Sequence, residues 1–141
     1  MLNVEHEQLN NLYRHWQSRC KGHRLPSRDS FDVMDLQPWM GHLILIAVLD
    51  HGEDFLYRLH GTTLVGIVGR DLTWRQVSEF QEQRRRDGLL RQYRKVARSG
   101  EPLFIACDDN PVELNFRSIR KLILPLSDSG EDVDMLLIGC Y

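Results

Sequence analysis

The chain has 141 residues, of which 42% are hydrophobic and 27% charged, the ordinary balance of a single folded domain with its own core. Its formal net charge of -2 excludes a global electrostatic attraction to nucleic acid or to an anionic membrane. No apolar run approaches the roughly 20 residues that cross a bilayer, and the polar start MLNVEHEQLNN does not have the pattern of a secretory signal.

An amphipathic helix is predicted near the N-terminus, over residues 5–21, within a segment that we delimit as 1–22. Its apolar residues recur at helical spacing, and they are Leu9, Leu12, Tyr13, Trp16 and Cys20. The apolar side either packs on the chain's own domain or contacts a second chain, and the spacing does not choose between the two.

Residues 23–41 are predicted to form a linker that packs on the core. Pro26 and Pro38 punctuate it, and its Asp and Ser residues favour turns and caps. The side chains expected to tether it are Phe31, Met34, Leu36, Trp39 and Met40.

Two strands follow the linker. Residues 42–49 (HLILIAVL) are nearly all apolar, which predicts a central strand covered on both faces. Residues 50–54 form a hairpin loop into a second strand, 54–60, whose side chains alternate between two faces.

Residues 62–80 are predicted to hold short helical pieces. Thr62 or Thr63 can cap the first piece, which two glycines interrupt, while Leu72 and Val77 anchor the second. Because short, glycine-broken helices bury little surface of their own, we expect this segment to form the wall of a pocket.

Residues 81–99 are predicted to form a longer helix that Gly100 ends. Its apolar residues lie along one side, and its Arg and Lys residues lie along the other. The basic residues could attract nucleic acid or an acidic partner. No aromatic platform or recognition motif accompanies them, so we favour a solvated helix face.

Three further strands are predicted at 103–107, 115–126 and 133–141, with a turn at 108–111. The middle strand alternates, with three leucines on one face and Lys121, Ile123 and Pro125 on the other. Pro125 indicates a sheet edge or a strand end. This order of elements predicts an α+β domain with segregated helices and strands.

Two stretches resemble a known family. One combines YRLHGT (57–62) with GRDLTWRQVSEF (69–80), and the other runs from LP-R-D-F-D to PW-G within residues 25–41. Both resemble PAS domains, in particular a group of small stand-alone bacterial PAS proteins. The resemblance implies a sensor domain over residues 42–141. Its fold would be a five-stranded antiparallel sheet with short helices and one longer helix over one face, in which the first two strands and the last strand are neighbours.

PAS domains often pair through an N-terminal helix, so the resemblance also implies a homodimer. The expected dimer contacts are Leu9, Leu12, Tyr13 and Trp16, with Trp16 as a buried anchor.

A small-molecule pocket between helices and sheet is the further implication of the resemblance. Such pockets are mostly apolar with a few orienting polar groups, for which Arg58, His60 and Cys107 are candidates. The pocket candidates are Tyr57, Leu59, His60, Leu64, Ile67, Val68, Leu72, Tyr93, Phe104, Leu122, Leu124, Leu136 and Ile138. The sequence does not fix which strand face meets the helices, and each of these residues could equally be ordinary core.

Better-known PAS domains bind their cofactors through sequence motifs that this chain lacks. Domains with a covalently bound flavin carry a reactive cysteine in an Asn-Cys-Arg motif, and residues 62–80 contain no cysteine. Haem-binding relatives use a histidine on the long helix, and residues 81–99 contain none. We therefore disfavour both modes, and the cofactor stays unspecified, with a non-covalent flavin or haem on another histidine such as His60 still open.

Metal ligands are not predicted. Asp108 and Asp109 are expected to be turn formers, and His15, Cys20 and His23 match no zinc spacing.

Catalytic residues are not predicted either, because no nucleophile, phosphate-loop or metalloprotease motif is present. A small cone-shaped α+β enzyme is the enzymatic alternative, and it would pair Asp54 with His60 or His42. Asp54 and His60 are about 20 Å apart along one strand, so they cannot form a dyad within it.

The three widely spaced cysteines indicate reduced thiols in a cytoplasmic protein rather than a disulfide framework. We thus predict a ligand-binding sensory or regulatory module that dimerises and signals through contacts with another protein. The ligand would be a small apolar molecule or metabolite, with no nucleic acid or membrane partner, and no output domain is expected in this chain. The alternative is a ligand-free interaction adaptor with a filled core.

Overall fold

The computed structural model describes residues 2–22, 24–106 and 119–141. Its described strands form one five-stranded antiparallel sheet in the order β2-β1-β5-β4-β3. They are β1 (Leu43–Leu49), β2 (Asp54–His60), β3 (Leu103–Ala106), β4 (Arg120–Leu126) and β5 (Met135–Cys140). The α-helices are α1 (Glu7–Arg19), α2 (Thr62–Val68) and α3 (Gln83–Ser99), and short 3₁₀ turns are η1 (Arg28–Ser30), η2 (Gln37–Trp39), η3 (Asp50–Gly52) and η4 (Val77–Glu79).

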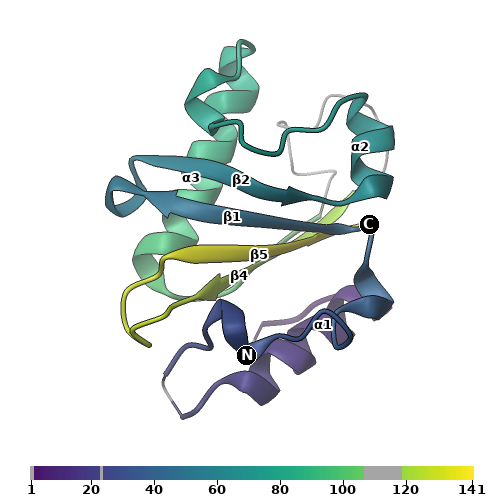
Figure 1. Cartoon of the computed structure of the whole chain (residues 1–141), viewed down its shortest axis with the longest axis vertical. Coiled ribbons are helices and arrows are strands. Elements are labelled where there is room, and N and C mark those ends of the chain that lie inside the picture. Colours follow the sequence, from purple (N-terminus) through teal and green to yellow (C-terminus); the bar gives the residue numbers. More distant parts are fainter. Residues whose placement is uncertain (1, 23, 107–118) are drawn as a thin grey trace.

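The sheet is covered on both faces, with α1 on one side and α3 on the other (Figure 1). β1 supplies both cores: Ile44 and Ile46 pack on the α3 side, while Leu43 and Leu45 pack on the α1 side. Because β1 pairs with both β2 and β5, the first two strands and the last strand are neighbours. The α+β fold and the central position of the first strand are therefore confirmed.

Helix α1 packs on the sheet of its own chain. Leu9 and Leu12 are fully buried there, and a Cβ at Gly139 of β5 would meet their Cδ2 atoms at 2.7 and 2.9 Å. Only glycine lets the helix approach the strand this closely. The His6 ring accepts a hydrogen bond from the Leu9 amide and so caps the helix start.

The linker packs on the core through its aromatic residues. Phe31, Leu36 and Trp39 are buried, and the Trp39 indole donates to the carbonyl of Gln8 at 2.7 Å. The predicted tethers at Met34 and Met40 are wrong, because these side chains are 73% and 43% exposed beside the 3₁₀ turns.

Helix α2 begins at a glycine rather than at a threonine cap. Gly61 is the N-cap residue, and the Gly41 carbonyl accepts from the amides of Thr63 and Leu64 at 3.0 and 3.3 Å. A neighbouring backbone thus satisfies amides that a threonine side chain was predicted to bind, so that prediction is wrong. The helix runs through Gly66 without a break and ends at Gly69, whose φ of 95° suits glycine.

The segment after α2 returns to the sheet. Leu72 and Val77 are buried, which confirms them as anchors. Beyond it, Glu82 caps the start of α3, because its carboxylate accepts from two amides of the first turn, and Gly100 caps the end of the helix as predicted. The predicted turn at 108–111, Cys107 and the strand portion 115–118 lie outside the described residues.

Candidate ligand-binding site

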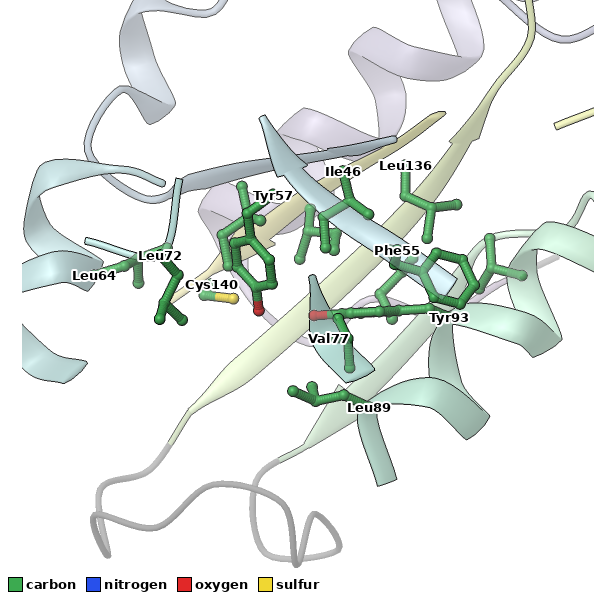
Figure 2. Packing of buried hydrophobic residues seen from close by; sticks show 14 of the residues in the cluster. Ile46, Phe55, Tyr57, Leu64, Leu72, Val77, Leu89, Tyr93, Leu136 and Cys140 are labelled. Atoms are coloured by element: carbon green, nitrogen blue, oxygen red, sulfur yellow. The ribbon is translucent and has the colours of Figure 1, made fainter. Parts of the chain in front are cut away.

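A cavity of about 180 Å³ lies between the sheet, α2 and the N-terminal half of α3. Its described lining comes from β1, β2, β4, β5 and both helices, and Figure 2 shows several of these side chains converging from separate elements. An engineered cavity of about 150 Å³ in another protein holds benzene, so this space suits a small ring or a short chain.

Strand register explains which side chains reach the cavity. Ile44 of β1 pairs with His60 of β2 and with Ile138 of β5. Two residues further along β5, Cys140 pairs with Lys121 of β4. Alternation then places Lys121 on the same face as Ile123, beneath α3. Consequently β4 contributes a cation to an otherwise largely apolar wall.

His60 is held in one tautomer at the end of β2. Its Nδ1 accepts a hydrogen bond from the Leu72 amide at 3.1 Å, so the neutral ring carries its proton on Nε2. Burial lowers the pKa of His60, the nearby Arg85 charge lowers it further, and Asp71, 3.9 Å from Nδ1, opposes the shift. At neutral pH the ring is therefore an uncharged hydrogen-bond donor at Nε2.

Tyr57 supplies a second neutral polar group. Its ring is buried, and its hydroxyl points toward that of Tyr93 on α3 (Figure 2). Burial raises its pKa well above the usual value, and the charge and hydrogen bond of Tyr93 raise it further. Tyr57 thus stays a phenol throughout the physiological pH range.

Two cationic side chains border the cavity, Lys121 and Arg85. Lys121 is only 2% exposed, and its Nζ lies 5.1 Å from the centroid of the Tyr93 ring. Arg85, in the first turns of α3, places its guanidinium 5.2 Å from the Phe80 ring centroid. Neither cation was among the residues predicted for the site.

Six of the predicted pocket residues line the cavity: Tyr57, His60, Leu64, Ile67, Val68 and Leu72. Three more lie in the same core without lining it: Tyr93, Leu136 and Ile138. Leu59 is 42% exposed, and Phe104, Leu122 and Leu124 pack on the opposite face of the sheet, beside α1. Arg58, a proposed polar group, lies outside the cavity over the Trp74 ring at 5.0 Å.

The lining residues that sequence reasoning missed are His42, Ile44, Arg85, Leu89, Ile119, Lys121, Cys140 and Tyr141. For Lys121 a signal was present, since it alternates with the leucines of β4 and so shares a face with Ile123. Once the leucines are assigned to the α1 side, Lys121 must face the cavity.

The four predicted dimer contacts are covered within one chain. Leu9, Leu12, Tyr13 and Trp16 are each at most 8% exposed, and they pack with Leu122, Leu124 and Leu137 of the sheet. A dimer made through them would require α1 to exchange between chains.

The other candidates for chemistry take structural roles. The Asp54 carboxylate accepts from the amide and hydroxyl of Ser78, at the opposite end of β2 from His60. His15 lies against the rings of Phe31 and Trp39. In the described ranges no three His, Cys, Asp or Glu side chains gather as a metal site, and His23, Asp108 and Asp109 fall outside those ranges.

Several arginines of α3 bind the protein itself. Arg94 donates to the carbonyls of Gly52 and Glu53, both at 2.8 Å, and Arg86 donates to the carbonyl of Phe80 at 3.0 Å. Arg98 approaches the Glu53 carboxylate at 3.5 Å. Part of the basic stretch therefore holds α3 against η3 and the preceding loop.

None of the helices in the described segments is long and apolar enough to cross a membrane.

The structure is thus an α+β domain with one antiparallel sheet, short helices over one face and a cavity beneath them. A family model described as PAS domain matches residues 4–141, nearly the whole chain. The chain therefore belongs to the PAS domain family, which confirms the resemblance in its sequence. Searches of curated proteins and of solved structures gave no significant match.

Proposed function

We propose that this PAS domain is a regulatory module that binds a small ligand in the cavity and passes its bound state to another protein. The single observation that supports the proposal is the space of about 180 Å³ between α2, α3 and the sheet. Small molecules bind in concave, mostly apolar pockets in which a few polar groups fix their orientation. A space of this size, walled by neutral and charged polar groups as well as apolar ones, has the character of a binding site.

The module would act by binding and not by catalysis. His60 accepts from the Leu72 amide at Nδ1 and Asp54 accepts from Ser78, which supports a role in binding over the pairing of Asp54 with His60. A ligand would instead shift the population of conformations in the short α2 wall, and that shift would be sensed through protein contacts.

The competing function is a ligand-free interaction adaptor, which needs no space for a ligand. Native mass spectrometry beside the denatured mass separates the two, with visible absorption as the check for a chromophore. We expect extra mass per folded chain that is released on denaturation. A folded mass equal to the chain mass, or to a clean multiple of it, would favour the adaptor.

A matched pair of variants on α2 ties any bound mass to the cavity. Ile67 lines the cavity and Val65, two residues earlier, does not. Ile67→Phe should fill the space and abolish retention of the ligand, whereas Val65→Phe should retain it. Equal retention by both variants would place the ligand elsewhere and contradict the proposed site.

We propose in addition that two copies pair through α1, by exchange of this helix between chains. Exchange would rebuild the contacts of Leu9, Leu12, Tyr13 and Trp16 on the partner sheet without new surface, which is a low-cost route to a dimer. Light scattering over a range of concentrations should give a dimer for the wild type. A monomeric wild type would rule this pairing out.

A further inference from the structure

We infer that the cavity takes a small organic anion, namely an apolar ring or short chain bearing one carboxylate or phosphate group. The inference rests on the proposed function and goes beyond it by naming the chemical class of the ligand. It is drawn from two cationic side chains on separate elements that border a space otherwise walled mainly by apolar residues.

Lys121 provides the first positive charge. It is the second residue of β4, is 2% exposed, and lines the cavity. A lysine that deep in a core is unusual, since long charged side chains normally reach solvent. Its placement puts an ammonium donor where a ligand in the cavity can reach it.

Arg85 provides the second charge from the facing helix. Its guanidinium presents a planar set of donors that suits carboxylate and phosphate oxygens. Burial is the main reason that the pKa of His60 is lowered, and the Arg85 charge lowers it further, which agrees with a cation close to the same cavity. Lys121 and Arg85 therefore approach one space from the sheet and from α3.

Neutral donors complete the polar part of the wall. His60 carries its proton on Nε2, and Tyr57 keeps its hydroxyl proton, so both can donate without bringing charge. Among the described residues that line the cavity there is no aspartate or glutamate. The carboxylate of Asp71, near His60 Nδ1, is 61% exposed and outside the lining. The described wall thus favours an anion over a cation.

Apolar residues form the other part of the wall. Leu64, Ile67 and Val68 of α2 extend from the β2 edge of the sheet, with Leu72 after them. Lys121 sits on β4, three strand positions across from β2, or about 14 Å at the usual strand spacing. A ligand would therefore point its anionic group toward β4 and α3 and its apolar body toward α2.

The size of the space selects the probes. A cavity of about 180 Å³ is close to one that holds benzene and below the roughly 300 Å³ at which sites for drug-sized ligands begin. Benzoate and hexanoate match it, with benzamide and hexanamide as uncharged isosteres. Phenyl phosphate distinguishes a phosphate from a carboxylate site.

Titration calorimetry of the full chain with these probes tests the inference. We expect benzoate or hexanoate to bind at least tenfold more tightly than its amide, because charge-assisted hydrogen bonds are roughly twice as strong as neutral ones. Lys121→Met and Arg85→Met should each weaken binding of the anion about tenfold. The matched controls Lys95→Met and Arg84→Met, at exposed positions of the same helix, should bind within about twofold of the wild type.

The outcomes separate this inference from the proposed function. Equal affinity for benzoate and benzamide, both lost in Ile67→Phe, would keep the ligand-binding function and overturn the anionic class. Binding of none of the probes at millimolar concentration would also overturn the class, whereas loss of the function itself would appear as a folded protein without retained mass. If circular dichroism shows that Lys121→Met does not fold, the test uses Arg85→Met, because Arg85 is only half-buried. Unchanged binding of the anion by Arg85→Met would then overturn the anionic class.

Discussion

The indole Nε1 of Trp16 donates a hydrogen bond to the carbonyl oxygen of Pro125, 2.9 Å away and 109 residues along the chain. In the described pairing β3 accompanies β4 only as far as Ile123, so Pro125 lies where β4 has a strand neighbour on one side alone. Proline has no backbone N–H to donate to a neighbouring strand, and at such a local edge no strand requires that donor. The indole of α1 occupies a carbonyl that the sheet leaves available, and this fixes the helix across the sheet.

Replacing this indole tests the bond. Trp16→Phe keeps an aromatic ring but leaves the buried Pro125 carbonyl without its donor, which costs about 1–3 kcal/mol of unfolding free energy. Urea denaturation measures the change. The control Trp74→Phe alters an indole that is 64% exposed and should stay within about 0.5 kcal/mol of the wild type. Equal effects at the two positions would show that the bond contributes nothing.

Two glycines give opposite predictions for the same substitution. Gly139→Ala would bring a methyl group to within 2.7 Å of Leu9 and 2.9 Å of Leu12, and overpacking of this kind costs about 1–3 kcal/mol. Gly66→Ala, inside α2, meets nothing within 4 Å and should stabilise the chain by about 0.5–1 kcal/mol through helix propensity. Thermal unfolding of both variants checks the signs. The double variant Gly139→Ala with Leu9→Ala should recover part of the loss, and an additive double variant would refute the proposed contact.

The sequence was sufficient to predict the element order, because alternation and glycine punctuation are local properties. β2 was predicted with the bounds Asp54–His60 that the structure has. The end of α3 was predicted because glycine commonly follows a helix, and Gly100 has the left-handed φ of 69° that only glycine adopts easily. The start of α2 could not be predicted in this way. Its first amides bind the carbonyl of Gly41, a residue of another segment, which no local pattern reveals.

A residue of the site could be predicted only where the sequence shows which side of its helix or strand faces the cavity. Leu64, Ile67 and Val68 of α2 were predicted correctly because residues three and four apart lie on the same side of a helix. Leu122 and Leu124 were assigned to the pocket, but they face α1, because period 2 fixes which residues share a face and not which face meets which helix. The same ambiguity concealed Lys121, whose face became clear only when the sheet was seen to be covered on both sides.

Arg94 is expected to stabilise the domain and not to serve as a docking charge. Its guanidinium donates to the carbonyls of Gly52 and Glu53, so Arg94→Ala should cost about 1.5 kcal/mol, at the low end for charge-assisted bonds because the site is partly exposed. Lys95→Ala removes the neighbouring exposed charge and should change stability by less than about 0.5 kcal/mol. Both values come from urea denaturation, and equal losses would contradict the structural role of Arg94.

Acidification should weaken the fold through His60. Its pKa is lowered from 6.5 chiefly by burial and also by Arg85, so between the folded-state pKa and 6.5 the unfolded chain binds more protons than the folded one. The unfolding free energy must then rise with pH through that window. The part of the stability that depends on neutral His60 is lost progressively as the pH falls below about 6.5. Protonation would also oppose the hydrogen bond that Nδ1 accepts from the Leu72 amide.

His60→Asn separates this effect from other titrations, since an asparagine oxygen can still accept from the Leu72 amide without titrating. Urea denaturation at pH 7.5, 6.5 and 5.5 should give a shallower pH dependence for this variant than for the wild type. Some slope should remain, because burial also lowers the pKa of His6 and His15. The control His51→Asn changes an exposed residue whose φ of 56° asparagine tolerates, and it should leave the slope unchanged. A slope equal to that of the wild type in His60→Asn would mean that His60 is not the group that links folding to pH.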